Sequence, residues 1–349
     1  AKIKVDNENL PLLYTPGVAE VVRSISKNKI NSYKYTIKNN TIAIISDGSR
    51  ILGLGNLGGE AALPVMEGKS LLYKIYGNIN AIPICLKTQN KKEIINVVEN
   101  ISINFGAINI EDIEAPKCFE VVNKLSKVLD IPVFHDDQHG TAVVVLAALI
   151  NSLKLVKKNL SKARIVILGA GAAGYGITNL LSYAGAKNIL VLDSHGIIYS
   201  RRNNLNKYKL ELGKMTNFNK EKGDLNKAIN NADVFIGVSA KRNILDYKLL
   251  EKMNNNAIVF ALSNPDPEIL PSEAKKAKNI KIIATGRSDF SNQVNNALVF
   301  PFLMKYILEN KIKKINAKLL SFAAEKLVNK IKKLSYDKII PDINEVKKF

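Results

Sequence analysis

The chain has 349 residues, of which 46% are hydrophobic and 23% are charged, and its formal net charge is +20. Its length is sufficient for two domains with separate cores, and its composition is that of a folded protein, which excludes a disordered chain. The positive charge is mostly lysine scattered along the sequence, and no aromatic-rich motif for stacking bases accompanies it, so we expect a solvated surface and no specific nucleic-acid partner.

The first third of the chain has the pattern of a small α/β domain. Apolar runs predict strands at 41–46, 81–86 and 131–134, and longer periodic stretches predict helices at 64–77 and 91–101. Residues 140–156 are apolar on most sides and predict a buried helix that joins two units. We therefore expect an N-terminal domain at 1–138 and a second domain at 139–349.

The second part alternates strands with helices. Strands are predicted at 164–168, 188–192, 234–238, 257–262 and 281–284. This alternation is typical of a parallel, doubly wound sheet of the Rossmann type. The lysine-rich, amphipathic stretch at 311–334 predicts a solvated C-terminal capping helix, in preference to a helix on a membrane surface.

Targeting and cysteine signals are weak. No apolar run reaches 18 residues, and residues 1–30 lack a secretory signal pattern. Cys85 and Cys118 are far apart and form neither a disulfide framework nor a metal knuckle. We expect a protein of the reducing cytoplasm with no membrane partner.

A dinucleotide-binding fingerprint follows the strand at 164–168. The loop supplies Gly169, Gly171, Ala172, Ala173 and Gly174 directly before a helical run, and Asp193 ends the next strand. Glycines allow close approach of a pyrophosphate to the helix N-terminus, and the Asp accepts from a ribose hydroxyl. Asp193 favours NAD, but His195, Arg201 and Arg202 could receive the 2′-phosphate of NADP, so both cofactors stay open.

A second glycine pattern, Gly53, Gly55 and Gly58, is weaker. DGSR separates it from its strand, and no acid ends a second strand about 20 residues later. We interpret it as a tight turn that could touch a ligand.

The sequence FHDDQHG at 134–140 raises the question of a zinc site. His135 and His139 have helical spacing, but Pro132 and the strand before them put His135 outside any helix, so the two-histidine zinc geometry is not expected.

Acidic residues at two distant points suggest a different metal. Glu111 and Asp112, together with Asp136 and Asp137, would repel one another in a cleft, and a hard divalent cation would remove that conflict. All-oxygen ligation favours Mg²⁺ or Mn²⁺. The alternative is that these are surface carboxylates paired with some of the 51 basic residues.

Eight ordered motifs together resemble the malic enzyme family in its short bacterial form, from about residue 10 to 341. They are YTPGVAE (14–20), SDGSRILGLG (46–55), PVMEGKS (64–70), EDIEAP (111–116), FHDDQHGTA (134–142), the GAGAAG loop, ALSNPDPEI (261–269) and TGRSDFSNQVNNALVFP (285–301). Each motif alone is unspecific, whereas the ordered set is highly specific.

The resemblance implies a role for each matched residue. It implies that Mn²⁺ or Mg²⁺ is held by Glu111, Asp112 and Asp137, that Asp136 orients Lys69, and that Lys69 is the general base and Tyr14 the general acid. Malate's carboxylates would be gripped by Arg50, Asn264 and Asn295, with Asn296 a neighbouring alternative. By the same resemblance Asn264 and Asn295 are also counted among the residues of the cofactor site, and neither histidine is a ligand.

The reaction implied is oxidative decarboxylation of (S)-malate to pyruvate and CO₂ with reduction of NAD or NADP. Malolactic enzymes, which keep NAD bound and release lactate, use the same residues and are one alternative. A basic binding protein on an inactive scaffold is another. The resemblance also implies a homodimer. However, KIKV at 2–5 matches the family's first strand, so the N-terminal helices that bind a second subunit are expected to be short or missing.

Overall fold

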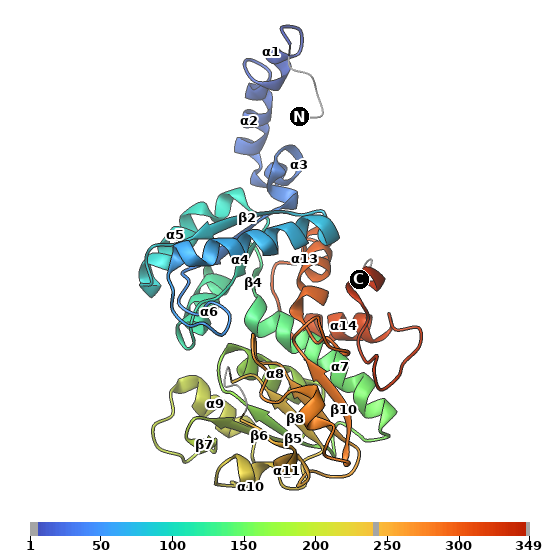
Figure 1. Cartoon of the computed structure of the whole chain (residues 1–349). Coiled ribbons are helices and arrows are strands. Elements are labelled where there is room, and N and C mark those ends of the chain that lie inside the picture. Colours follow the sequence, from blue (N-terminus) through green and yellow to red (C-terminus); the bar gives the residue numbers. More distant parts are fainter. Residues whose placement is uncertain (1–5, 240–243, 347–349) are drawn as a thin grey trace.

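A computed structural model of the chain describes residues 6–239 and 244–346 and contains one parallel sheet and one mainly parallel sheet, joined through one long buried helix (Figure 1). This confirms the predicted α/β class. The KIKV segment lies outside the described residues.

The first sheet has four parallel strands in the order β2-β1-β3-β4. Its strands are β1 (Thr41–Ser46), β2 (Asn80–Cys85), β3 (Ala107–Ile110) and β4 (Val133–His135), and its connecting helices are α4 (Gly59–Leu72), α5 (Lys91–Ile101) and α6 (Lys117–Val128). Three of these strands were predicted; β3 was missed, and its short apolar run AINI is interrupted by the polar Asn109. Since parallel strands end at one edge, the residues that follow β3 and β4 come together.

The second sheet has the order β10-β9-β8-β5-β6-β7, with only β7 antiparallel among the described strands. Its strands are β5 (Arg164–Leu168), β6 (Asn188–Asp193), β7 (Gly196–Ile197), β8 (Val234–Gly237), β9 (Ala257–Ala261) and β10 (Ile280–Thr285), so all five predicted strands are confirmed. Helices α8 (Ala172–Tyr183), α9 (Lys207–Met215), α10 (Leu225–Ile229), α11 (Tyr247–Leu250) and α12 (Pro271–Ala274) connect them.

The predicted joining helix is confirmed as α7 (Thr141–Leu155), which continues a π-helical turn, η5 (Asp136–Gly140). By length and composition alone the 20-residue stretch Asp136–Leu155 could cross a membrane, but 67% of its most apolar window is buried inside the protein, as in many core helices. One hydrophobic cluster runs from β1 through α7 to β5. The expected domain boundary at 138 falls within η5 and stays a prediction.

Two C-terminal helices complete the core beside α7. They are α13 (Phe300–Glu309) and α14 (Ala317–Val328). The predicted capping helix therefore exists as α14, but it is solvated on one face only, because Leu320, Ala323 and Leu327 are buried in the same cluster as α7.

In the described part of the chain, three α-helices precede β1 and project from the rest of the molecule (Figure 1). They are α1 (Leu10–Leu13), α2 (Val18–Lys27) and α3 (Ser32–Tyr35), and no residue within them is buried. We call residues 6–37 the N-terminal arm. The helices of this arm therefore make few contacts with the rest of the described chain.

Candidate active site

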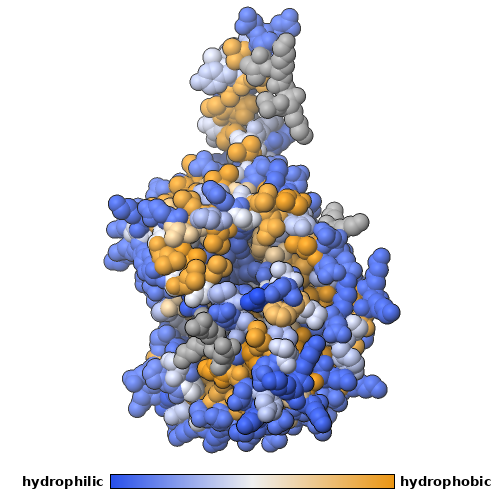
Figure 2. Space-filling view, viewed as in Figure 1, coloured by the Kyte–Doolittle hydropathy of each residue, from blue (hydrophilic) through white to orange (hydrophobic). Residues whose placement is uncertain are grey.

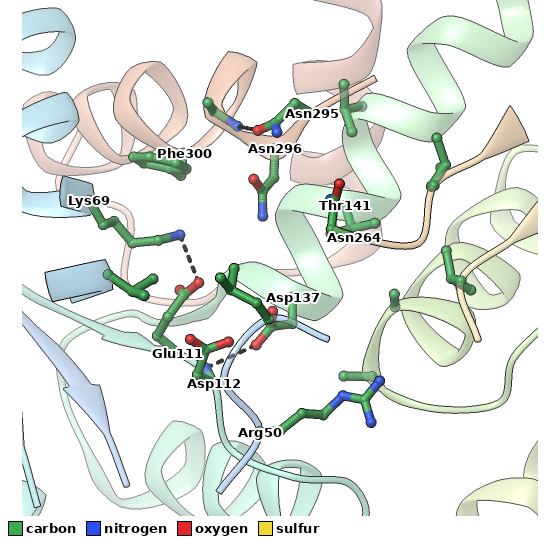
Figure 3. A pocket seen from close by; sticks show the side chains of 18 of the residues that line it. Arg50, Lys69, Glu111, Asp112, Asp137, Thr141, Asn264, Asn295, Asn296 and Phe300 are labelled. Atoms are coloured by element: carbon green, nitrogen blue, oxygen red, sulfur yellow. Dashed lines mark hydrogen bonds and ion pairs between the residues drawn. The ribbon is translucent and has the colours of Figure 1, made fainter. Parts of the chain in front are cut away.

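A cavity of about 470 Å³ opens between the two sheets at the carboxyl ends of their strands. Both parts of the chain line it. From the N-terminal part come Arg50, Lys69, Glu111, Asp112 and Asp137, and from the C-terminal part come Thr141, the glycine loop at 171–173, Asn264, Asn295, Asn296 and Phe300 (Figure 3). The position matches the general rule that ligands of doubly wound proteins bind beyond the strand ends.

Three carboxylates face one another at the floor of the cavity (Figure 3). One oxygen from each of Glu111, Asp112 and Asp137 lies within 4.8 Å of the others. Burial and the neighbouring acids raise the pKa of Glu111 well above its usual value and that of Asp112 to about 7. One buried oxygen of Asp112 has no hydrogen-bond partner. Buried carboxylate oxygens crowded together in this way fit a hard divalent cation such as Mg²⁺ or Mn²⁺.

Glu111 is held from behind by two residues that sequence reasoning missed. Asn109, in β3, donates from Nδ2 to a Glu111 carboxylate oxygen at 2.9 Å, and Tyr73 donates its hydroxyl to Asn109 Oδ1 at 2.8 Å. All three side chains are buried. A polar residue inside the apolar run AINI was the only sequence signal for Asn109. This chain of hydrogen bonds fixes the orientation of Glu111 before anything binds.

Lys69 projects from α4 toward the carboxylates at the bottom of the cavity. Its ammonium forms ion pairs with Glu111, at 2.9 Å, and with Asp136, and it lies 4.1 Å from the centroid of the Phe300 ring. Burial lowers the pKa of Lys69, but the two carboxylates outweigh it and leave that pKa raised. Asp136 is fully buried and faces Lys69; its orienting role stays a prediction.

The two histidines of FHDDQHG are arranged as structural partners. His135 ends β4 and its Nε2 lies 3.4 Å from Asp137, whereas Nδ1 of His139 accepts from the His135 backbone at 3.1 Å. Burial lowers the pKa of His139 to about 3, so its ring is neutral.

Polar side chains surround the remaining walls. Arg50 and Asn264 both line the cavity, and a Cβ at Gly53 would come within 2.1 Å of the Asn264 carbonyl oxygen. The weaker glycine pattern therefore lets the loop after β1 approach the Asn264 backbone. Asn295 caps a turn, because its Oδ1 accepts from Ala297 N at 2.9 Å, while Asn296 points into the cavity (Figure 3).

The dinucleotide fingerprint has the predicted geometry. A Cβ at Gly174 would come within 1.8 Å of the Gly169 carbonyl oxygen, whereas one at Gly171 would meet open space. Ala172 and Ala173 start α8, so the N-terminus of that helix faces the cavity. Close packing at one glycine and an open approach at another is what pyrophosphate binding requires.

Asp193 is more crowded than the fingerprint predicts. One carboxylate oxygen accepts from His195 N at 2.9 Å and from Arg202 Nη1 at 2.9 Å, and the other accepts from Arg202 Nη2 and from Lys209 Nζ at 2.7 Å. A carboxylate has about four acceptor positions, so the chain itself fills them. Despite its burial, these donors lower the pKa of Asp193 to about 2.

Tyr14, the expected general acid, lies apart from the cavity. It follows α1 on the N-terminal arm, it is 67% exposed, and it does not line the cavity. Within a single chain the structure thus brings together the expected metal ligands, Lys69, Asp136, Arg50 and the asparagines, but not Tyr14.

Comparisons with known proteins cover nearly the whole chain. Residues 2–126 match the family model "Malic enzyme, N-terminal domain", and residues 138–349 match "Malic enzyme, NAD binding domain". An NADP-dependent malic enzyme from Halomonas elongata is 46% identical over 88% of this chain and 72% of its own length. A bifunctional malic/malolactic enzyme from Bacillus subtilis is 44% identical over 98% and 84%, respectively. The crystal structure of an NAD-dependent malic enzyme from Thermotoga maritima, 46% identical, superposes with a TM-score of 0.94 over 99% of this chain and 93% of that one.

Proposed function

The chain belongs to the malic enzyme family and is an NAD(P)-dependent, decarboxylating oxidoreductase, and we propose that the cavity between its sheets converts (S)-malate to pyruvate and CO₂. The observation that carries this proposal is the convergence of three carboxylates and Lys69 beside the dinucleotide loop. A hydride acceptor, a base and a cation site within one cavity are what the oxidation of a 2-hydroxy acid needs.

Lys69 is proposed as the base that takes the proton of the malate C2 hydroxyl while the C2 hydride leaves for the nicotinamide. The carboxylates of Glu111 and Asp136 raise the pKa of Lys69 and keep its amine protonated. Lys69 can act as a base only when the negative charge beside it is reduced. Mg²⁺ or Mn²⁺ held by Glu111, Asp112 and Asp137 would neutralise Glu111, which is also an ion-pair partner of Lys69, and would thereby lower the pKa of Lys69; it would also polarise the substrate's oxygen. Asp136 keeps the amine aimed at the substrate.

The resulting β-keto acid loses its C4 carboxylate as CO₂ and leaves the enolate of pyruvate. A proton must then be delivered to C3, and Tyr14 is the residue to which the family resemblance assigns that step. Arg50 and Asn264 line the cavity where they can bind the two carboxylates of malate. Asn296, whose amide points into the cavity, is a better candidate for the third contact than Asn295, which would have to leave its cap.

The nucleotide is proposed to be NAD or NADP, bound with its pyrophosphate on the loop from Gly169 to Gly174. Arg202 and Lys209 cancel the charge of Asp193, so a 2′-phosphate is not repelled there. Free Cys85 and Cys118 are consistent with a reducing cytoplasm, and a homodimer is the proposed assembly.

A malolactic outcome is the second candidate, because the Bacillus subtilis relative is named for both activities. In that reaction the reduced nicotinamide stays bound and returns its hydride to pyruvate. Both outcomes need the same base and cation site, so they differ in how long the nucleotide stays in its cleft.

One assay separates them. The chain is incubated with (S)-malate and Mn²⁺, with NAD or NADP, and free reduced nucleotide, pyruvate and lactate are quantified. The proposal expects pyruvate and reduced nucleotide in equal amounts, with activity lost on chelation. Lactate without net reduced nucleotide would support the malolactic outcome, and no consumption of malate under any condition would overturn both.

A further inference from the structure

Glu268 is a buried acid that lies outside the cluster of carboxylates at the bottom of the cavity. It belongs to the loop after β9, shortly beyond Asn264, and none of its surface is exposed. Figure 2 shows mostly hydrophilic residues on the outside of the lower part of the molecule, where charged side chains are normally found. The proposed mechanism does not use Glu268, so the burial of its carboxyl group has a different cause.

The carboxyl group of Glu268 accepts hydrogen bonds at the ends of two neighbouring strands. One oxygen accepts from Ser263 Oγ at 2.5 Å and from the Ser239 backbone N–H at 3.3 Å, and the other accepts from the Ser263 backbone N–H at 3.2 Å. Ser239 lies just beyond β8, and Ser263 lies just beyond β9. A buried polar network of this kind holds its members in one arrangement. Glu268 therefore ties the carboxyl ends of β8 and β9 together.

Strand β8 has no side chain where Glu268 approaches it. A Cβ at Gly237 would come within 2.3 Å of Glu268 Cδ, and its three nearest heavy atoms all belong to that carboxyl group. The backbone of Gly237 is not in the left-handed region, so its conformation alone does not require a glycine. A glycine inside a strand often marks such a close approach. The space for the Glu268 carboxyl group is thus built into β8.

The two serines that Glu268 holds lead to two different parts of the cavity. Ser263 directly precedes Asn264, which lines the cavity and is proposed to bind a carboxylate of malate. Ser239 lies against the nucleotide loop, because a Cβ at Gly169 would come within 3.1 Å of the Ser239 nitrogen. One buried side chain therefore contacts the backbone that carries a substrate residue and the backbone that supports the nucleotide loop.

Asn264 is closely surrounded on its other sides. A Cβ at Gly53 would come within 2.1 Å of the Asn264 carbonyl oxygen, and a Cβ at Gly286 would come within 2.8 Å of its Nδ2. The loop after β1 and the loop after β10 thus approach Asn264 without side chains of their own. Its position is then set by these two loops and by Ser263, which Glu268 holds from behind.

We propose that Glu268 is a positioning residue that sets the spacing between Asn264 and the nucleotide loop. The hydride on C2 of malate has to reach the nicotinamide, and a misplacement of about 1 Å between reacting groups strongly slows such a step. Glu268 touches neither malate nor the nucleotide, and it acts through Ser263 and Ser239. This inference rests on the proposed function.

Glu268→Gln tests the proposal, because it keeps the size of the side chain but replaces one acceptor oxygen by an NH₂ group that cannot accept. We expect the KM for malate and the dissociation constant of the reduced nucleotide both to rise roughly tenfold. Steady-state kinetics and fluorescence titration with NADH or NADPH measure them. The affinity for Mn²⁺, measured by calorimetry without malate or nucleotide, is expected to stay at the wild-type value, since its ligands lie beyond β3 and β4.

The matched control is Glu273→Gln on α12, whose partly exposed carboxylate pairs with Lys276. It is expected to keep the wild-type value of all three constants. A folded Glu268→Gln variant in which neither constant rises, or only one of them, would overturn the proposal. So would a fall in Mn²⁺ affinity of the same size, because it would indicate a general structural defect.

A double variant tests the route through Asn264. Asn264→Ala alone is expected to raise the KM for malate. If Glu268 acts on malate through Asn264, adding Glu268→Gln should raise that KM by less than about twofold more, whereas the nucleotide dissociation constant should still rise roughly tenfold. A further tenfold rise in the KM for malate would show that the two residues act independently, and the proposal would fall.

Gly237→Ala approaches the same carboxyl group from β8 and changes no residue of the cavity. It is expected to displace Glu268 and to raise both constants as Glu268→Gln does. If neither variant folds, the role of Glu268 is purely structural and the proposal is overturned. Absence of malate turnover in the wild type would instead contradict the proposed function, and the fluorescence titration would still test the link from Glu268 to the nucleotide loop.

Discussion

The protein has two buried clusters of charged side chains, one at the ends of β3 and β4 and one at the end of β6. Carboxylates outnumber cations in the first cluster, and cations outnumber carboxylates in the second. In the first, the single ammonium of Lys69 faces four carboxyl groups, those of Glu111, Asp112, Asp136 and Asp137. In the second, the single carboxylate of Asp193 faces Arg202 and Lys209. The pKa of Glu111 and Asp112 is raised, whereas that of Asp193 is lowered to about 2.

The difference separates an incomplete site from a complete one. Buried oxygens of Asp112 and Asp136 have no hydrogen-bond partner in the first cluster, while the acceptor positions of Asp193 are filled in the second. A buried charge without a partner destabilises the fold by several kcal/mol, so a cation that binds in the first cluster would stabilise it. The second cluster has a cation in excess and is compatible with an added phosphate.

The largest effect is expected from Lys69→Met, which removes the only ammonium from the first cluster. The side chain keeps its apolar length, but no base remains for the C2 hydroxyl, so kcat should fall by roughly 10³-fold. Steady-state kinetics with saturating malate and Mn²⁺ measures it. Lys74→Met, on an exposed lysine in the turn after α4, is the matched control and should keep wild-type turnover; an equal loss in both variants would contradict the assignment.

A smaller effect is expected from Asn109→Leu, which removes the support of Glu111 but leaves all three cation ligands in place. Residues that orient a metal ligand typically contribute about 10- to 100-fold in affinity, and we expect a loss in that range for Mn²⁺. Calorimetric titration of the nucleotide-free chain measures it directly. Asn104→Leu, on the exposed turn before β3, serves as control; unchanged Mn²⁺ affinity in Asn109→Leu would exclude the positioning role.

Asp193→Ser tests whether the cluster around Asp193 faces the adenosine ribose of the nucleotide. Removal of the carboxylate frees Arg202 and Lys209 to bind a 2′-phosphate, and charge-assisted hydrogen bonds of this kind contribute about 1.5–3 kcal/mol each. We expect the ratio of kcat/KM for NADP to that for NAD to rise on the order of tenfold. A ratio that falls or stays constant would mean that the cluster does not face the adenosine ribose.

The smallest effect concerns acid stability. The pKa of Asp193 in the folded chain, about 2, is below its value of about 3.9 in an unfolded chain, so its ion pairs stabilise the fold above about pH 4 and lose that contribution as the pH falls toward 2. Asp193→Asn should therefore lower the free energy of unfolding at pH 7 on the order of 1 kcal/mol, after solvent screening. Urea denaturation at several pH values measures it, and the gap between variant and wild type should narrow on acidification. A constant gap would contradict the ion-pair account.

The sequence predicted most of the second sheet because its strands are runs of buried β-branched residues, such as RIVIL at 164–168. It identified Glu111 and Asp137 but could not predict their separation, because β3 and β4 are brought side by side only by the fold. The pairing of Asp193 with Lys209 depends in the same way on α9 returning to the end of β6. For Tyr14 a motif suggested the chemistry, whereas its distance from the cavity, on an exposed arm, became known only from the fold.

The central claim is that Glu111, Asp112 and Asp137 form one cation site. Calorimetric titration of the full chain with Mn²⁺, without malate or nucleotide, tests it most directly, with Asp137→Asn and the exposed Asp337→Asn as a matched pair. We predict one Mn²⁺ per chain, an affinity at least roughly 100-fold weaker in Asp137→Asn, and no change in Asp337→Asn. Equal Mn²⁺ affinity in the wild type and in a folded Asp137→Asn variant would contradict the claim.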